Sequence, residues 1–371
     1  MRLYVLWLLS LAIMLAGCGG QPAAQMSTPG PARPTSAPAA PGAAASADLA
    51  GIKKYLVEQT AGLVDAVADL QTSVDRYFAL ARELNFDYST LWANRRDAVI
   101  AELEAARAAW IVASPIYEKM EGIVAGTPAL AQFDVDIDAG AAAADDPENA
   151  VSFDLVLLDG RIFPKPGNLF GVTESALWGT EPEYAAPVDA DWNGDGGITF
   201  GETLPDAHVL ESAAAMLFAK ANELAAAAQA WEPTESDAFT ALVVMVPTMS
   251  EYFASWRDSR FVSGEAATQR DFNVISRLAD IQDILSGLEL VYAQLRPRVE
   301  KVDPVQAEQI EAGLRDLKAF VADIYRQEQN GRRFTPEEAD ILGVEAQNRA
   351  TAITGQISQM AGALGVAIEA E

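Results

Sequence analysis

The stretch LAGIKKYLVEQTAGLVDAVADLQTSVDRYFALAREL, residues 49–84, decides the class of fold. Its large apolar residues recur every three or four positions, which places them on one face of an α-helix. They are Leu49, Ile52, Leu56, Leu63, Val67, Leu70, Val74 and Phe78. Such a face must be buried against other helices, so the stretch predicts one long helix of a bundle.

The same periodicity continues along the chain. A second apolar face consists of Ile275, Leu278, Ile281, Leu285, Leu288 and Tyr292. The sequence also predicts where two helices begin. One start has the form of a capping box, Thr335-Pro336-Glu337-Glu338, and the other begins in the same way at Asp303-Pro304. The predicted helices span residues 49–84, 89–122, 168–179, 206–230, 235–257, 265–296, 304–329 and 336–366.

These helices predict an all-α fold of two packed helical bundles. We expect one domain over residues 48–371, with the first bundle at roughly 48–230 and the second at 231–371. The segment 123–167 is rich in Gly, Asp and Pro and is expected to be irregular, with 151–158 as a candidate short strand.

Residues 1–17 have the parts of a secretory signal: a positive start, an apolar run and a small-residue exit. The apolar run is shorter than the ~20 residues that span a membrane. The tetrapeptide LAGC at residues 15–18 resembles the bacterial lipobox, so we expect a lipid on Cys18. An ordinary export signal followed by an incidental cysteine is the alternative.

The segment 18–47 holds small residues and prolines and is expected to be a disordered tether. The folded part would then be held at a membrane by its lipid. This predicts a cell-envelope protein, either on the outer side of the cytoplasmic membrane or in the periplasm.

The chain is strongly acidic, with 53 Asp and Glu against 26 Lys and Arg and a formal net charge of −27. That charge argues against nucleic acid as a partner and suits cations. Solubility alone explains an acidic surface equally well, so both interpretations stay open.

The sharpest motif is DWNGDGGITFGE, residues 191–202. Oxygen-bearing side chains occupy loop positions 1, 3, 5, 9 and 12, and glycine occupies position 6, as in an EF-hand calcium loop. The predicted calcium ligands are Asp191, Asn193, Asp195, Gly197 through its carbonyl, Thr199 and Glu202.

Pro182 and Pro187 disfavour a long helix entering this loop. We therefore expect an isolated calcium loop that stabilises the structure rather than a calcium sensor. A polar turn that binds no calcium is the alternative.

A second acidic group suggests another metal site. Glu118 and Glu121 are three residues apart on a predicted helix and so share a face. Downstream, three alternating aspartates would share one side of an extended segment: Asp134, Asp136 and Asp138. Carboxylates favour hard or borderline cations such as Fe³⁺, Mn²⁺ or Ca²⁺. A solvated acidic face is the alternative.

The sequence offers little for a hydrolase. His208 is its only histidine and Cys18 its only cysteine. A zinc-protease helix needs two histidines, and no Gly-x-Ser-x-Gly elbow occurs.

The run ESALWG, residues 174–179, resembles the signature of the imelysin family, in which Gly-x-His-x-x-Glu is followed by Leu-Trp-Gly. PIYEKME at 115–121 and DIDA at 136–139 resemble stretches of the EfeO-like branch, an iron-uptake component of the envelope. The segments 250–261 and 276–288 also resemble imelysin sequences.

The resemblance implies an all-helical pair of bundles, an envelope location and a role in iron acquisition. It makes Glu174 a candidate metal ligand, together with Glu118 and Glu121. Leu169 stands where the family has glycine and Gly171 where it has histidine, so the motif histidine is missing. Family members were first labelled metallopeptidases, but the resemblance better supports metal binding.

The leading hypothesis is a membrane-tethered, non-enzymatic cation-binding lipoprotein that assists uptake of iron or another metal. An iron permease is a candidate partner. Calcium would be held separately at 191–202. The first alternative is a calcium-stabilised surface interaction module without a transport role. An envelope metallopeptidase is the least favoured. Convergence of Glu118, Glu121 and Glu174 in one pocket would favour the leading hypothesis.

Overall fold

The computed structural model describes residues 47–369. The predicted signal sequence at 1–17, Cys18 and the tether up to residue 46 lie outside the described residues. The described part is mainly helical, and its only sheet pairs β1 (Leu155–Val156) with β2 (Ile162–Phe163). The predicted all-α fold is confirmed.

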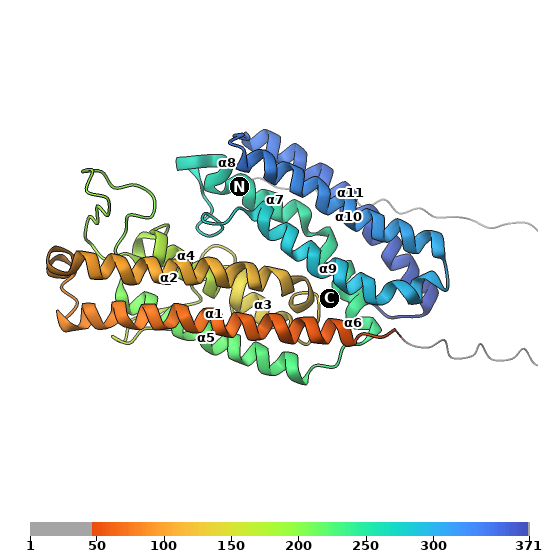
Figure 1. Ribbon diagram of the computed structural model, residues 1–371, viewed down its shortest axis with the longest axis horizontal. Coiled ribbons are helices and arrows are strands. Elements are labelled where there is room, and N and C mark those ends of the chain that lie inside the picture. The colour runs from red at the N-terminus through yellow and green to blue at the C-terminus, as the bar shows by residue number, and fades with distance from the viewer. Residues whose placement is uncertain (1–46, 370–371) are drawn as a thin grey trace, which may run out of the picture. The chain divides into compact units, whose positions relative to one another are not determined.

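The first bundle consists of α1 (Ala50–Glu83), α2 (Tyr88–Val124) and α5 (Ala207–Ala230), with α4 (Leu169–Trp178) packed against α2 and α5 (Figure 1). The predicted apolar face of α1 is buried in this bundle, as shown by Leu56, Leu63 and Leu70, which are fully buried. Asp87 caps α2 by accepting a hydrogen bond from the backbone N–H of Thr90 at 3.0 Å. Removing such a cap typically costs about 1 kcal/mol, which helps to fix where α2 begins.

The second bundle consists of α6 (Glu235–Met245), α7 (Met249–Asp258), α9 (Arg277–Glu300), α10 (Pro304–Gln329) and α11 (Pro336–Leu364). In it α10 packs on α9, and α11 packs on both α7 and α10 (Figure 1). Both predicted helix starts are confirmed, since Asp303 caps α10 and Thr335 forms a capping box with Glu338 on α11.

The bundles join where α2 packs against α9. Glycines allow this close approach: a Cβ added to Gly122 would lie 2.8 Å from Leu288 Cδ2, and one added to Gly287 would collide with the carbonyl oxygen of Lys119. Overpacking of this kind costs about 1–3 kcal/mol. The two helices are therefore held close at the level of residues 118–122.

The structure corrects two predicted helices. The predicted helix 235–257 is interrupted at Pro247, where a short 3₁₀ turn (Val246–Thr248) separates α6 from α7. By length and composition this stretch could span a membrane, but 56% of its most apolar window is buried in the protein, as is typical of core helices. The predicted helix 265–296 instead begins at Arg277, after α8 (Arg260–Ser263), a 3₁₀ turn (Gly264–Ala266) and a loop.

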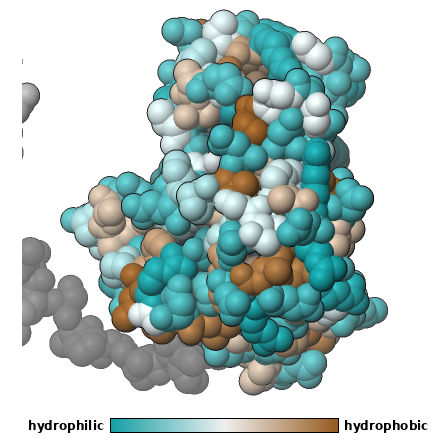
Figure 2. Space-filling view, turned by 90° about the vertical axis from the view of Figure 1, so that its left-hand side faces the viewer, coloured by the Kyte–Doolittle hydropathy of each residue, from teal (hydrophilic) through white to brown (hydrophobic). Residues whose placement is uncertain are grey.

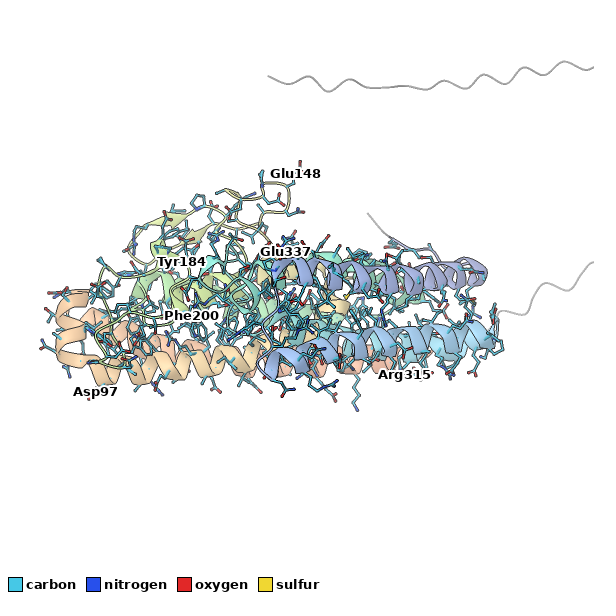
Figure 3. All side chains as sticks on the ribbon, turned by 90° about the horizontal axis from the view of Figure 1, so that it is seen from above. Asp97, Glu148, Tyr184, Phe200, Arg315 and Glu337 are labelled. Atoms are coloured by element: carbon cyan, nitrogen blue, oxygen red, sulfur yellow. The ribbon has the colours of Figure 1, made fainter. Side chains whose placement is uncertain are left out.

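The segment 123–167 is irregular, as predicted, but it is not extended at its start. It contains α3 (Ala131–Asp134) and a π-helix (Val135–Ala139). Of the candidate strand 151–158, only β1 is a strand. Glu148 lies on a loop that stands away from the helices (Figure 3). Asp134, Asp136 and Asp138 would share one side only in an extended segment, and that condition is not met.

The face drawn in Figure 2 is mainly hydrophilic, with small separate hydrophobic patches. This agrees with the large excess of acidic residues. Scattered exposed apolar residues are normal on a folded protein, so the patches alone indicate no partner.

Candidate cation-binding site

Three acidic side chains meet beside the junction of α2 and α9. Glu118 and Glu121 lie one turn apart on α2, and Asp138 lies in the π-helix. Each is at most 2% exposed. One carboxylate oxygen from each lies within 4.8 Å of the others, and no other group of three His, Cys, Asp or Glu residues within 47–369 meets that distance. We call Glu118, Glu121 and Asp138 the carboxylate trio.

One buried cation faces the trio. Arg277, the first residue of α9, places Nη1 3.2 Å from both carboxylate oxygens of Glu118 and 3.4 Å from Oδ2 of Asp280. Its Nη2 lies 3.9 Å from Oε1 of Glu121, and its Nη1 lies 4.0 Å from Oδ2 of Asp138. Four buried carboxyl groups therefore surround a single guanidinium.

Burial raises the pKa of several carboxyl groups in and beside this cluster. Desolvation lifts the pKa of Glu118 and of Asp138 well above their ordinary values, and repulsion from neighbouring carboxylates adds to it while Arg277 opposes it. The same causes raise the pKa of Asp134 to about 8, and desolvation raises that of Asp280 to about 7. Buried carboxylates in this number need protons or a bound cation.

Two trio oxygens have no hydrogen-bond partner within the described part of the chain: Oε2 of Glu121 and Oδ2 of Asp138. The neighbouring oxygens are satisfied, since Oε1 of Glu121 accepts from the Tyr252 hydroxyl at 2.8 Å and Oδ1 of Asp134 accepts from the Tyr117 hydroxyl at 2.8 Å. Buried polar atoms without partners are uncommon. Two of them within one group of three carboxyl side chains make the trio a candidate place for a ligand.

A cleft of about 550 Å³ leads to the trio, with Glu121, Asp138 and Arg277 in its wall. Its wall also includes Arg270 and Asp271, from the loop that precedes α9. The cleft is therefore formed by residues of both bundles.

Glu174 lies near the trio but outside it. It is 1% exposed, and its two oxygens accept the backbone N–H groups of Phe272 at 3.0 Å and of Asn273 at 2.8 Å. Burial raises its pKa to about 8. Glu174, Asp138 and Asp280 border a cavity of about 10 Å³, which has room for about one water. Glu118 and Glu121 thus converge, whereas Glu174 anchors the loop that precedes α9.

The place of the missing motif histidine is filled. A Cβ added to Gly171 would lie 2.9 Å from Oδ2 of Asp271 and 3.0 Å from Oδ1 of Asn168. Asn168 caps α4 by accepting the backbone N–H of Gly171 at 2.6 Å. A larger side chain at 171 would have to displace this cap or the loop.

The three alternating aspartates diverge because the segment that holds them is helical. Asp134 and Asp138, one turn apart, both line the cleft. Asp136 instead accepts the backbone N–H of Ser152 at 3.0 Å and pairs with Lys220 at 3.4 Å. It stabilises the loop and is separate from the trio.

The predicted calcium loop, 191–202, is exposed and has no helix directly before it, as the two prolines predicted. The oxygens of Asp191 accept the N–H groups of Gly194 at 2.6 Å and Gly196 at 2.9 Å. Glu202 accepts the N–H and the hydroxyl of Thr199, both at 2.8 Å. The side chains named as ligands are thus hydrogen-bonded within the loop.

The carboxylates of Asp191, Asp195 and Glu202 do not bring three oxygens within 4.8 Å of one another. Arg96 supports the start of the loop by donating to the carbonyl oxygens of Asp191 at 2.6 Å and Trp192 at 2.8 Å. Calcium binding here, including the roles of Asn193, Gly197 and Thr199, stays a prediction.

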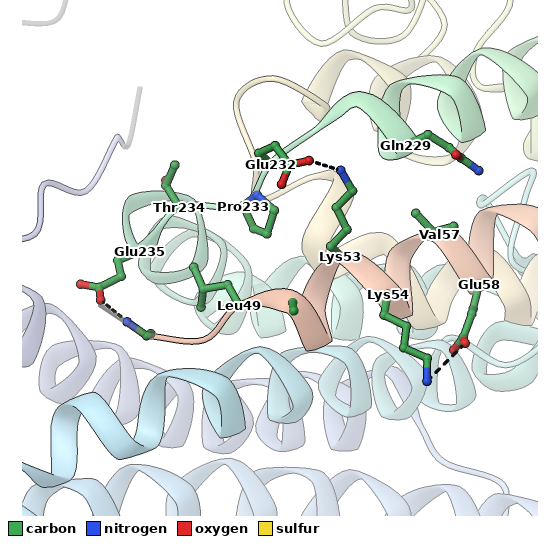
Figure 4. A pocket seen from close by; sticks show the side chains of 12 residues that line it. Leu49, Lys53, Lys54, Val57, Glu58, Gln229, Glu232, Pro233, Thr234 and Glu235 are labelled. Carbon is green, nitrogen blue, oxygen red and sulfur yellow. Dashed lines mark hydrogen bonds and ion pairs between the residues drawn. The ribbon is translucent and has the colours of Figure 1, made fainter. Parts of the chain in front are cut away.

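A larger cavity, about 740 Å³, lies between the start of α1 and the connection from α5 to α6 (Figure 4). Its charged groups pair with one another: Lys53 with Glu232 at 2.6 Å and Lys54 with Glu58 at 3.8 Å. It contains none of the trio, and its paired charges suggest no ligand.

Sequence reasoning missed Arg277, Asp280 and Tyr252 as site residues. Arg277 and Asp280 are three residues apart at the start of a helix whose buried face is otherwise mainly aliphatic. That spacing was the available signal for a buried ion pair. No spacing or charge pattern near Tyr252 indicated that it would lie in the site.

Two solved structures are similar to this chain. One is a Parabacteroides distasonis ATCC 8503 protein named as an iron-regulated protein A precursor, with 13% identity, a TM-score of 0.44, and coverage of 87% of this chain and 96% of the other. The other is an imelysin-like protein from Psychrobacter arcticum 273-4, with 16% identity and a TM-score of 0.41. The match covers 88% of this chain and 100% of the other.

No curated protein matches this chain in sequence. The family model for imelysin matches residues 53–360, which include both bundles, the trio and Glu174. The predicted resemblance is therefore confirmed over most of the chain. The protein belongs to the imelysin family.

Proposed function

We propose that this protein is a membrane-tethered cation-binding protein of the cell envelope that assists metal uptake, with Glu118, Glu121 and Asp138 as the ligands of the transported ion. The observation that carries the proposal is the pair of buried oxygens on Glu121 and Asp138 that have no hydrogen-bond partner among the described residues. They lie in a group of four buried carboxyl groups that has a single arginine beside it.

The ligand chemistry defines the class of ion. Three carboxylates suit hard or borderline cations such as Fe³⁺, Mn²⁺ or Ca²⁺ and disfavour soft ones. Iron is the first candidate because the sequence stretches around Glu118 and Asp138 resemble the iron-uptake branch of the family. An iron permease would be the partner that receives the ion.

Lipid attachment at Cys18 would hold the protein beside such a partner, and calcium at 191–202 would serve as a separate structural ion. Two acyl chains are enough for stable anchoring. Both features rest on the sequence motifs.

The test is calorimetric titration of the purified full chain with Mn²⁺ and with citrate-buffered Fe³⁺. Asp138→Asn removes one ligand charge and should weaken binding by about tenfold or more, a loss of ~1.4 kcal/mol. Asp136→Asn is the matched control, since Asp136 lies in the same π-helix but bonds Ser152 and Lys220. Equal binding by both variants and wild type would remove the trio as the site.

A second candidate function is a surface interaction module stabilised by calcium. It is favoured by the loss of the motif histidine, whose space Asp271 and Asn168 fill. In that case calcium alone would bind, and Glu202→Gln, not Asp138→Asn, would abolish its binding.

A further inference from the structure

Arg277 lies where its charge competes with an incoming cation. Its guanidinium contacts all three trio residues: Glu118 at 3.2 Å, Glu121 at 3.9 Å and Asp138 at 4.0 Å. A metal bound to the same three carboxylates would face this positive charge across the same oxygens. The buried setting strengthens that repulsion relative to water.

The guanidinium is held only in part by hydrogen bonds. Its Nε is buried and has no hydrogen-bond partner among the described residues. Instead the group lies between two rings, 4.0 Å from the centroid of Phe272 and 4.5 Å from that of Tyr252. An arginine committed to one carboxylate forms two parallel N–H···O bonds, whereas Arg277 reaches Glu118 through Nη1 alone.

The side chain also has space into which it can withdraw. Arg277, Phe272 and Tyr252 all line the 550 Å³ cleft, so movement of the guanidinium would not require the core to open. Phe272 has a positive φ of 55°, and its N–H is held by Glu174 at 3.0 Å. Glu174 thereby fixes the ring that covers Arg277, which gives the family's motif glutamate a positioning role in this chain.

We propose that Arg277 is a built-in competitor of the cation site: it offsets part of the trio's negative charge when no metal is bound and withdraws into the cleft as a metal enters. This inference rests on the proposed function and adds a determinant of specificity. A monovalent ion gains no more from the trio than the guanidinium does. A multivalent ion gains more, so the site selects multivalent cations.

The test compares Mn²⁺ affinity in wild type, Arg277→Met and Arg277→Lys full-length protein by calorimetry. Loss of the competing charge in Arg277→Met should lower the Kd for Mn²⁺ by about tenfold or more and enlarge the rise in Tm that Mn²⁺ causes. Arg277→Lys keeps the charge but loses the stacking on Phe272 and Tyr252, so its Kd should lie between those of wild type and Arg277→Met. Arg296→Met is the matched control, because Arg296 lies on the same helix but forms only surface ion pairs.

If wild type binds Mn²⁺ and Arg277→Met binds it equally or more weakly, Arg277 is a structural residue, and the inference fails while the proposed function stands. If none of the proteins binds Mn²⁺, both fail. Should Arg277→Met not fold, the crystal structure of wild type grown with Mn²⁺ decides: Nη1 of Arg277 must lie farther than 3.2 Å from Glu118. An unmoved arginine beside a bound metal would overturn the inference.

Discussion

Burying the carboxyl groups around Arg277 lowers the stability of the folded protein. Burying a charged group costs several kcal/mol even when it is paired, and hydrophobic replacements of buried ion pairs are often neutral or stabilising. Four carboxyl groups around one arginine exceed what pairing requires. Stability alone therefore does not explain such a cluster.

The raised pKa values predict how stability depends on pH. The pKa of Asp134 is about 8 in the folded protein, against 3.8 ordinarily, so between these values the folded state holds a proton that the unfolded state has lost. The metal-free protein should therefore lose stability as pH rises from about 4 to 8, at up to about 1.4 kcal/mol per pH unit for this group. Urea unfolding at a series of pH values measures the slope.

Asp134→Asn keeps an oxygen to accept the Tyr117 hydroxyl and removes the ionisable group. Its stability should fall less steeply over the same pH range than that of wild type. Identical slopes would mean that Asp134 is already ionised in the folded protein at neutral pH.

At the residue scale, local spacing identified Glu118 and Glu121 but could not supply their partners. Asp138 was named for the wrong reason, because the segment is helical and not extended. Arg277 is 159 positions from Glu118, so only the packing of α2 against α9 reveals their contact. The role of Glu174 also depends on a distant loop, 98 positions away at Phe272.

At the scale of elements, apolar periodicity located most helices because each must bury one face. It failed at 265–276, where tertiary bonds override a helix-compatible sequence. Asn273 accepts the N–H of Arg260 at 2.9 Å, and Glu174 holds the N–H groups of Phe272 and Asn273. These bonds keep the segment as a loop that lines the cleft beside the trio.

The α2–α9 contact predicts that a Gly→Ala substitution destabilises the protein there, whereas the same substitution at an open helix position stabilises it. At Gly287 the new methyl group would collide with the carbonyl oxygen of Lys119 and should destabilise the protein by about 1–3 kcal/mol. At Gly355, an exposed position in α11 with nothing within 4 Å, the same change should stabilise by about 0.5–1 kcal/mol. Thermal unfolding of both variants checks the signs, and equal effects would refute the close helix contact.

The loop 191–202 gives a prediction of its own. If it binds calcium, a hundredfold excess over the Kd should stabilise the protein by about 2.7 kcal/mol. Glu202→Gln should abolish most of that gain, because Glu202 is the predicted two-oxygen ligand. Calorimetric melting with calcium and with chelator measures the stabilisation by calcium. An unchanged stabilisation in the variant would mean that calcium binds elsewhere.

At the scale of the whole molecule, the candidate cation site uses both bundles: Glu118 and Glu121 come from the first, and Arg277 and Asp280 from the second. Periodicity predicted the two bundles, but the relative placement that creates the site is a property of their packing. Since both bundles contribute, an ion that binds here should stabilise the entire fold by mass action.

The predicted anchor is tested by Cys18→Ser in cells. The wild-type protein should sediment with membranes, and the variant should be soluble, because the serine hydroxyl cannot form the thioether to the lipid. Membrane association of both proteins would mean that another feature attaches the chain.

The most direct measurement is anomalous X-ray diffraction from crystals of the protein grown with Mn²⁺, recorded on both sides of the manganese absorption edge. We predict a manganese peak at bonding distance from carboxylate oxygens of Glu118, Glu121 and Asp138, the trio that the structure brings within 4.8 Å. Manganese peaks only at 191–202, or none in the protein, would contradict the account.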